Sequence, residues 1–470
     1  MPKTYCIIES ESHCGAHYEC WQKITKRLDA EGWRKTNKVR SSGIILVKQC
    51  CMTTDELNEA MDSLVRLSKQ KVQGRVFLGE CLSRTKELVE VAKKKLTNLK
   101  IFQFTTPEEF FNQLDETFGE TSITPTILQD GSAIVNISYG CNRKCTFCKV
   151  AYMDYKLQSV PMSEIIEIVE LARQQGVKRV VLNAMNSTEY NDQGKRLPDL
   201  LRALLEIPDM LYQLNGIVMV ELTDETIELL RNSRFIFLQM ELQSFIPAVR
   251  EKMGVGEMSK EKILSIFKRL QGKMIASNVM TGYCRENDVN FREQLEIIEQ
   301  NNLHFLSVNF LVPTPGTKAA SLRNPSAEKA KERLLTLTEV LLKLRLDLAK
   351  EMIGKEQTGI IYATYKCGET LVLCDKGVFI SIEGNNFEVG ARITVTPRSI
   401  KGLFIGEQQN FILSEQEQQE KEFGEEQAIK MMISISKMRM ENEETCGGFN
   451  MMDMSLEKYC EGYITKGLRK

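Results

Sequence analysis

The chain of 470 residues lacks a strong net charge, a long apolar run and an apolar signal segment at Met1-Pro2-Lys3-Thr4. Its 62 lysines and arginines nearly balance its 63 aspartates and glutamates. Overall charge therefore does not draw the protein onto nucleic acid or an anionic membrane, and only a local basic face could do so. No apolar run reaches the roughly 20 residues that a membrane-spanning helix needs. We expect a cytoplasmic protein with no membrane partner.

The length and the cysteine content of the chain further limit the class of protein that it can be. A chain of this length is too long for one ordinary core, so we expect two to four domains. Its 14 cysteines do not make a secreted disulfide scaffold in so long a chain. In a reducing compartment they serve as metal ligands or as small buried residues.

Three cysteines, Cys141, Cys145 and Cys148, lie within eight residues, just after the apolar run 133–138 and the turn Tyr139-Gly140. Three thiolates on one loop favour a 4Fe-4S cluster with one iron left open for a small-molecule ligand. The alternatives are a structural zinc loop and three unrelated buried cysteines. Zinc normally takes four protein ligands in a structural site, and no fourth Cys or His lies nearby. The spacing therefore favours the cluster.

The first 120 or so residues alternate strand-like and helix-like patterns, which predicts a small α/β domain with a parallel sheet. The continuous apolar run Gly43–Val47 is typical of a strand that is covered on both faces. The other expected elements are strands Tyr5–Ile8 and Arg75–Gly79 and helices Tyr18–Leu28, Thr54–Leu67 and Thr85–Leu96.

Cys14 follows the first of these strands, Cys50 and Cys51 the second, and Cys81 the third, so Cys14, Cys50 and Cys81 would give one cysteine from each strand end. Loops beyond the carboxyl ends of neighbouring parallel strands meet at one edge of a sheet, where ligands bind. The three cysteines are therefore a candidate three-point metal site, with coincidentally buried thiols as the alternative. Cys6 lies within a strand and Cys20 within a helix, and we interpret both as packing residues.

Between about residues 128 and 325 a strand–helix rhythm repeats six times, which predicts an open, partial β/α barrel. The expected strands are Ala133–Ser138, Arg179–Leu182, Gly216–Glu221, Phe235–Met240, Met274–Met280 and Phe305–Leu311. Gly176 ends the expected helix Ser163–Gln174. The apolar stripe of that helix consists of Ile165, Ile168, Val169 and Ala172. Barrels of this kind carry their chemistry at the strand carboxyl ends, where the clustered cysteines lie.

A long helix, Ser326–Met352, leads to a region of short strands and glycine turns that predicts a small antiparallel β-barrel. Its strands are expected at Gly359–Thr364, Leu371–Cys374, Val378–Ile382 and Arg392–Thr396. Bases in this region are matched by acids, which weakens a role in tracking phosphates. The fold class is α/β overall, and we expect domains at 1–125, 126–352 and 353–407, with an acidic, Met-rich extension at 408–470.

The sequence resembles the radical S-adenosylmethionine (SAM) superfamily and, within it, the methylthiotransferases. The motifs that carry the resemblance are Gly140–Cys148, Leu242-Gln243-Ser244 and Phe310–Thr317. The order of domains is similar too: a three-cysteine domain, a radical core and a C-terminal barrel that resembles a TRAM domain. The resemblance covers roughly residues 3 to 406.

The resemblance implies two 4Fe-4S clusters and SAM as cofactors, with a reductant such as flavodoxin or ferredoxin. The cluster on Cys141, Cys145 and Cys148 would bind SAM and cleave it to a 5′-deoxyadenosyl radical, which abstracts hydrogen from an unactivated C–H bond. The second cluster, on Cys14, Cys50 and Cys81, would present or sacrifice sulfur that a further SAM methylates. Cys50 fits the family position better than its neighbour Cys51, and an exchange between the two stays open.

Further contacts to the cofactor are expected from the ends of neighbouring strands. They would come from Asn183, Met185, Gln243, Ser244, Thr281 and Gly282. Ordinary loop capping is the alternative role for Gln243 and Ser244.

The sequence departs from the family pattern in four places. Ala184-Met185 stands where the family usually has Gly-Gln, and Glu241 where it usually has Pro before Leu-Gln-Ser. Asn278 and the turn Gly282–Glu286 replace an Asp and a Gly-Phe-Pro-Gly-Glu turn. Cluster ligands are kept while residues on the substrate side differ, so the chemistry is expected to be kept and the substrate to differ.

The macromolecular substrates of the family are an adenosine beside the tRNA anticodon, a side chain of a ribosomal protein, and ribosomally made peptides. A tRNA enzyme should show a basic face with aromatic residues, and this sequence shows no such enrichment. We favour a protein or peptide substrate, with tRNA as the alternative. Two other classes stay open: a radical SAM enzyme that inserts no sulfur, and a non-catalytic iron–sulfur binding module.

Overall fold

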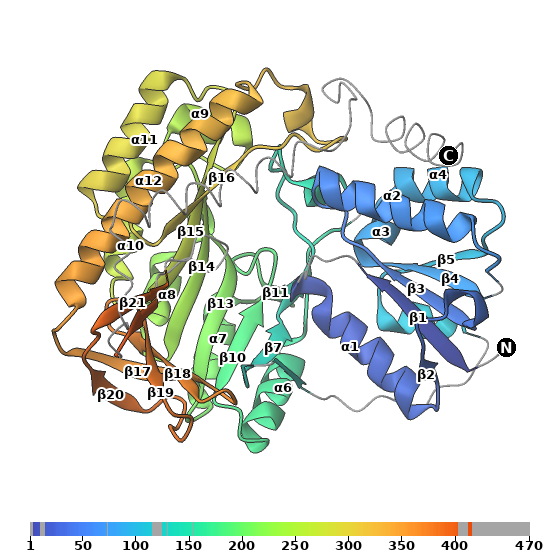
Figure 1. Cartoon of the computed structure of the whole chain (residues 1–470), viewed down its shortest axis with the longest axis horizontal. Coiled ribbons are helices and arrows are strands. Elements are labelled where there is room, and N and C mark those ends of the chain that lie inside the picture. Colours follow the sequence, from blue (N-terminus) through green and yellow to red (C-terminus); the bar gives the residue numbers. More distant parts are fainter. Residues whose placement is uncertain are drawn as a thin grey trace.

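A computed structural model describes residues 3–9, 15–72, 74–114, 125–128, 130–153, 155–402 and 412–415. Three main sheets follow one another along the chain, drawn in blue, in green to yellow, and in orange to red (Figure 1). This arrangement confirms the expected α/β fold class with a C-terminal β region. Of the helices that the structure describes, none is both long and apolar enough to cross a bilayer.

The N-terminal sheet is parallel throughout, in the order β2-β1-β3-β4-β5. Its central strand β3 (Ile44–Lys48) is buried on both faces, as its apolar run predicts. Ile44 and Leu46 pack on one side, and Ile45 and Val47 on the other. The remaining strands are β1 (Thr4–Glu9), β2 (Arg34–Lys35), β4 (Arg75–Gly79) and β5 (Ile101–Phe104). The helices are α1 (Gly15–Ala30), α2 (Thr54–Ser68), α3 (Glu80–Arg84), α4 (Lys86–Lys95) and α5 (Pro107–Asn112).

The central sheet has the order β16-β15-β14-β13-β10-β7-β6. Six of its strands are parallel, and the short edge strand β6 (Thr126–Ile127) runs antiparallel to β7 (Ala133–Asn136). This confirms the expected six parallel units. The other parallel strands are β10 (Arg179–Asn183), β13 (Leu211–Val218), β14 (Phe235–Gln243), β15 (Met274–Thr281) and β16 (Leu306–Phe310).

Amphipathic helices cover one face of this sheet. In α6 (Met162–Gln174) the predicted apolar stripe is buried against alternate residues of β7 and β10, as helical and strand periodicities require. The opposite, inner face carries the polar side chains that concern the site. The other helices are α7 (Leu197–Glu206), α8 (Asp224–Leu230), α9 (Pro247–Met253), α10 (Lys260–Arg269), α11 (Asp288–Gln300) and α12 (Ala327–Met352).

Strand β13 differs from the prediction. It begins at Leu211 and ends at Val218, whereas the sequence pattern placed a strand at Gly216–Glu221. Gly216 has a φ of +73°, and the pairing with β14 shifts register between Leu214 and Ile217. This bulge breaks the alternation that marks a strand in the sequence. Glu221 lies in a 3-10 turn after the strand.

The third sheet contains six strands in the order β20-β17-β18-β19-β22-β21. The four expected strands are present as β17 (Gln357–Tyr365), β18 (Glu369–Cys374), β19 (Phe379–Glu383) and β20 (Arg392–Val395). The structure adds β21 (Ser399–Gly402) and β22 (Ile412–Ser414), and β22 pairs parallel with β19, so the sheet is not wholly antiparallel as expected.

We propose domain limits near residues 125 and 352, in the connections between the three sheets. β22 lies beyond the limit that we expected at residue 407, so we propose that the third domain extends to residue 415. The rest of the acidic, Met-rich extension lies outside the described residues.

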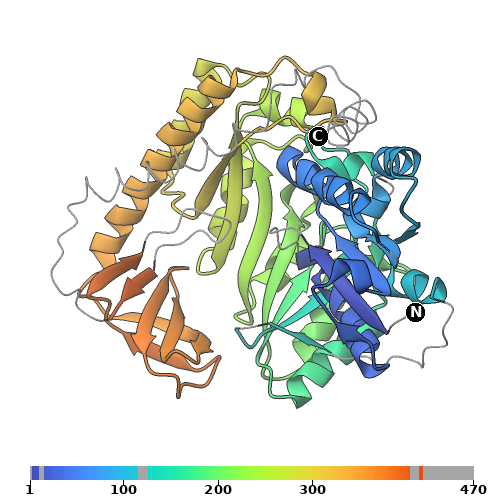
Figure 2. The same ribbon diagram turned by 45° about the vertical axis from the view of Figure 1, so that its right-hand side comes forward.

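The third sheet packs against the amino-terminal end of the central sheet. Tyr362 of β17 lies under the guanidinium of Arg179, the first residue of β10, 3.9 Å from ring centroid to Cζ. Arg179 also donates to the Tyr362 hydroxyl at 2.9 Å and pairs with Asp130 at 2.6 Å. Apolar residues of both sheets, including Phe237, continue this contact. Figure 2 shows the third sheet near the lower end of the central strands.

We predict that Tyr362→Ala lowers the free energy of unfolding by about 3 kcal/mol, because it removes a buried ring and leaves Arg179 without its aromatic partner. Urea unfolding of the metal-free chain followed by circular dichroism measures this change. Phe387→Ala, at a ring that is 39% exposed, is the matched control and should change stability by less than about 0.5 kcal/mol. Equal effects of the two changes would contradict the packing role of Tyr362.

Candidate iron–sulfur and SAM site

The three-cysteine loop leaves the carboxyl end of β7 and is closed by a ribbon of β8 (Ser138–Tyr139) and β9 (Gln158–Ser159). Gly140 begins the loop with a φ of +71°, and a side chain there would meet the carbonyl oxygen of Lys156 at 2.3 Å. Only glycine fits such a position without strain. The Cys141 amide donates to the Tyr155 carbonyl at 3.1 Å, which ties the start of the loop to its returning arm.

The middle of the loop is anchored to the opposite side of the central sheet. Thr146 donates its amide to the carbonyl of Met253 and its hydroxyl to the carbonyl of Lys252, both at 2.8 Å, at the end of α9. The Thr146 hydroxyl also hydrogen-bonds the hydroxyl of Tyr283 after β15. Lys149, 2% exposed, donates to the carbonyl of Pro315 at 2.9 Å. These bonds fix the three cysteines across the edge of the sheet.

The thiols of Cys141, Cys145 and Cys148 are partly buried and lie close enough to influence one another. Burial raises the pKa of each above its ordinary value, and the pKa of Cys148 rises to about 11. Without a metal the three are therefore neutral at physiological pH. Iron would replace these protons, since thiolates are the ligands of iron–sulfur clusters. The donor set fits a 4Fe-4S cluster with three protein ligands.

Arg143 is a half-buried cation of this loop. Its guanidinium hydrogen-bonds the Cys145 thiol and pairs with Glu221, which follows β13. Glu221 also accepts from the Asn186 amide at 3.1 Å and the Thr188 hydroxyl at 2.9 Å. The sequence analysis did not single out Arg143 or Glu221. Polar residues at the carboxyl ends of parallel strands often form sites, and this rule indicates the region after β13. The bulge in β13, however, obscures in the sequence where that strand ends.

The second set of cysteines lies at the carboxyl edge of the N-terminal sheet. Cys50, Cys51 and Cys81 are buried in one apolar cluster, and Cys81 lies on α3, directly after β4. Cys14 lies outside the described residues. The neighbouring Gln49 is 3% exposed, and neither the nitrogen nor the oxygen of its amide has a hydrogen-bond partner among the residues that the structure describes. A buried amide without a partner beside buried thiols fits a bound group at this edge.

Tyr155 joins the two sets of cysteines. Its carbonyl accepts from Cys141, while its ring lies under the guanidinium of Arg84, 3.8 Å from the centroid to Cζ. Arg84 ends α3, the helix that carries Cys81. Met153, also on the returning arm of the loop, packs on the cluster that contains Cys81. The N-terminal sheet is therefore held directly against the three-cysteine loop.

Within the described residues, no three Cys, His, Asp or Glu side chains converge as ligands of a single metal ion. In a 4Fe-4S cluster each thiolate binds a different iron, so the thiols are spread more widely than the ligands of one ion.

Asn183 and Gln243, two of the expected cofactor contacts, lie on the inner face of the central sheet. Asn183 donates to Asn136 at 2.7 Å and accepts from Asn215 at 3.4 Å, which makes a row of amides across β7, β10 and β13. Gln243 has a φ of +70°, which is rare for a residue with a side chain and often marks a functional site. Met185 is half-buried in the loop after β10.

Ser244 and its neighbours form a fixed turn after β14. Arg250 holds this turn by donating to the carbonyls of Leu242 at 2.6 Å and Ser244 at 3.1 Å. The Ser244 hydroxyl donates to Gln294 of α11 at 3.0 Å, so it is engaged away from the amide row.

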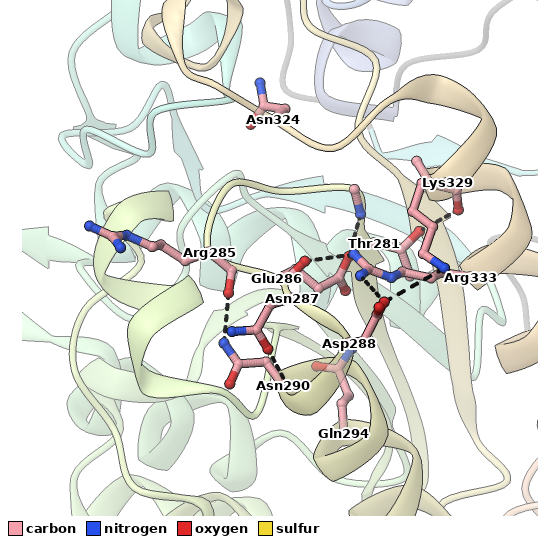
Figure 3. Close-up of polar contacts among 12 residues, drawn as sticks. Thr281, Arg285, Glu286, Asn287, Asp288, Asn290, Gln294, Asn324, Lys329 and Arg333 are labelled. Atoms are coloured by element: carbon pink, nitrogen blue, oxygen red, sulfur yellow. Dashed lines mark hydrogen bonds and ion pairs between the residues drawn. The ribbon is translucent and has the colours of Figure 1, made fainter.

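Thr281 and Gly282 begin a second fixed turn, shown in Figure 3. The Thr281 hydroxyl donates to the carbonyl of Ala330 on α12 at 3.2 Å, and a side chain at Gly282 would meet the Ala330 side chain at 2.5 Å. The Gly282 amide donates at 2.7 Å to Glu286, which pairs with Arg333 at 3.0 Å. The structure thus places Asn183 and Gln243 on the inner face and uses Ser244, Thr281 and Gly282 to pack the turns against helices.

Comparison with known proteins agrees with this geometry. Residues 135–298, from β7 through α11, match the model of the radical SAM superfamily. The parallel sheet, its three-cysteine loop and this match define a radical SAM protein.

Curated relatives indicate the family. The ribosomal protein uS12 methylthiotransferase RimO of Legionella pneumophila (strain Lens) is 24% identical over 72% of this chain and 83% of its own length. The threonylcarbamoyladenosine tRNA methylthiotransferase MtaB of Aquifex aeolicus is 26% identical over 69% of this chain and 77% of its own. A solved structure, the radical SAM methyltransferase TsrM from Kitasatospora setae, is 11% identical and covers 66% of this chain and 75% of its own, with a TM-score of 0.45. The chain contains a radical SAM domain and is similar to radical SAM methylthiotransferases, a family whose cofactors are SAM and two 4Fe-4S clusters.

We predict that Arg143→Gln slows alkylation of Cys145 in the metal-free chain about tenfold at pH 8, because each unit of pKa changes the thiolate fraction tenfold. Burial raises the pKa of Cys145, and the hydrogen bond from Arg143 opposes this rise, so losing Arg143 raises the pKa further. Mass spectrometry after timed iodoacetamide treatment measures the rate. Alkylation of Cys148 should keep rising with pH up to about 11.

The matched control is Lys144→Gln, which removes the neighbouring, exposed positive charge. It should leave the rate at Cys145 almost unchanged. A rate in Arg143→Gln equal to that of the unchanged chain would show that Arg143 does not influence this thiol.

Proposed function

We propose that the chain inserts a methylthio group at an unactivated C–H bond of a protein or peptide side chain in the cytoplasm. The cluster that binds SAM and, when reduced, yields the 5′-deoxyadenosyl radical takes its ligands from Cys141, Cys145 and Cys148. The auxiliary cluster, which supplies the sulfur, takes its ligands from Cys14, Cys50 and Cys81, with Cys51 as the alternative to Cys50. A reductant such as flavodoxin or ferredoxin supplies the electrons.

The contact through Tyr155 is the observation that carries this division of roles. Insertion of sulfur needs the carbon radical and the sulfur source close to the same substrate atom. Tyr155 binds the backbone of Cys141 and stacks with Arg84, on the helix that carries Cys81. An auxiliary cluster at Cys50 and Cys81 would therefore adjoin the loop at which SAM is cleaved.

The third sheet supports a protein or peptide substrate over tRNA. Among its described cations, Arg392 pairs with Asp375 at 2.6 Å. Tyr362 and Phe379, which could stack on unpaired bases, pack on each other with ring centroids 4.8 Å apart. Binding to single-stranded RNA uses free aromatic faces and unpaired cations. The amide contacts that the inner face offers suit a peptide.

We predict that Cys145→Ala abolishes cleavage of SAM, whereas Cys81→Ala keeps cleavage and loses only sulfur insertion. Each variant should retain about four of about eight irons after anaerobic reconstitution, since each removes one cluster. Iron and sulfide analysis, together with 5′-deoxyadenosine formation under strong reductant, measures both effects. Cys367→Ala, at an exposed cysteine, is the control and should keep all the iron. Loss of cleavage in Cys81→Ala would contradict the division of roles.

Comparison of a strain that lacks the gene with its parent tests the substrate class. We expect unchanged tRNA nucleosides and the loss of a methylthio group, which adds the mass of CH2S, from a protein or peptide. Mass spectrometry of digested tRNA and of the proteome measures both. Loss of a methylthio-nucleoside would instead establish tRNA as the substrate. Formation of 5′-deoxyadenosine without any methylthio product would favour a radical enzyme that inserts no sulfur.

A further inference from the structure

Glu241 places a carboxylate on the inner face of the central sheet. Side chains alternate along β14, and Leu238, Met240 and Leu242 face the helix-covered core. Gln239, Glu241 and Gln243 therefore line the opposite face, where Glu241 is half-buried. Its charge also influences the pKa of Cys145, so it lies near the three-cysteine loop.

Two side-chain amides donate hydrogen bonds to the Glu241 carboxylate. Gln239 donates to one Glu241 oxygen at 2.7 Å, and Gln243 donates to the other at 2.8 Å. The Gly216 amide donates to the Gln239 oxygen at 2.9 Å, and a backbone N–H can only donate. The nitrogen of Gln239 must therefore face Glu241. Gln243 in turn accepts from Asn278 at 3.3 Å.

Each Glu241 oxygen keeps a free lone pair as far as the described residues go, because a carboxylate offers about four acceptor positions and these residues use two of them. If Glu241 were protonated, its O–H would need an acceptor, yet both neighbouring groups donate. Burial raises the pKa of Glu241, and the two donors oppose this rise by stabilising the ionised form, which leaves each oxygen able to accept one more hydrogen bond.

Glu241 has no cationic partner within the described residues. The two nearby carboxylates differ in this respect: Glu221 pairs with Arg143, and the charge of Arg143 also acts on Glu189. Arg250 uses its donors on backbone carbonyls. A half-buried carboxylate without a countercharge is costly, and a bound cation removes that cost.

We propose that Glu241 binds a cationic N–H group, an ammonium or a guanidinium, of a molecule held over the inner face. The identity of that molecule, as SAM or a protein or peptide substrate, rests on the proposed function. The cation is either the α-ammonium of SAM or a lysine or arginine side chain of the substrate. In both cases two charge-assisted hydrogen bonds would fill the remaining acceptor positions of the two Glu241 oxygens. Glu241 stands where the family usually has Pro, so this contact with a cation would distinguish this chain from typical family members.

The test is equilibrium binding to the anaerobically reconstituted, unreduced protein, for which no methylthio product is needed. Glu241→Gln keeps the size of the side chain and removes the charge. The first arm measures SAM, 5′-dimethylsulfonio-5′-deoxyadenosine, which keeps the adenosine and the sulfonium but has no ammonium, and 5′-methylthioadenosine, which has neither cation. The second arm measures, with SAM present, N-acetylarginine amide and N-acetyllysine amide against the neutral N-acetylglutamine amide. Glu299→Gln, at an exposed glutamate of α11, is the matched control.

If the cation belongs to SAM, Glu241→Gln should bind SAM about tenfold to a hundredfold more weakly and bind the two analogues without an ammonium as before. If it belongs to the substrate, the affinity for SAM should stay the same, and the preference for the cationic probes should disappear. Glu241→Asp, which keeps the charge, should restore part of the lost binding in either case. An unchanged affinity for all probes, or equal losses for charged and neutral ones, would overturn the inference. If Glu241→Gln changes binding but the protein forms no methylthio product, the proposed function is wrong and the inference about Glu241 still holds.

Discussion

The parallel direction of the six central strands is the constraint on which the site depends. Parallel strands all end at the same edge, so the loop after β7, Asn183 at the end of β10 and Gln243 at the end of β14 meet there, although more than 100 residues separate the first from the last. The helices between the strands bury one face and leave the other for polar side chains. Chemistry at the carboxyl edge follows from this geometry.

A second constraint joins the N-terminal sheet to this edge. The returning arm of the three-cysteine loop carries both Met153, which packs on the apolar cluster around Cys81, and Tyr155, which stacks with Arg84. The two cysteine sets are therefore linked through the few residues of this arm. The third sheet holds the opposite end through Tyr362 and Arg179 and leaves the carboxyl edge to the N-terminal sheet.

Local patterns in the sequence predicted much of this molecule. Apolar periodicity located β3 and the buried face of α6, and the spacing of Cys141, Cys145 and Cys148 indicated one soft metal site. The pair Arg143–Glu221 could not be predicted, because its partners lie 78 residues apart and the bulge at Gly216 hides the end of β13. The parallel pairing of β22 with β19 is likewise a contact between distant segments that no local pattern reveals.

Electrostatics decide what kind of molecule this edge favours. The three thiols are neutral before iron binds, since burial raises the pKa of each, and iron loading would convert them to thiolates. Arg143 offsets part of that charge but is shared with Glu221, and Arg250 spends its donors on backbone carbonyls. Glu241 adds a further negative charge beside Cys145. The irons of a cluster would themselves offset much of the thiolate charge, so Glu241, which has no cationic partner among the described residues, is the group at this edge that favours a cationic molecule over a neutral one of the same shape.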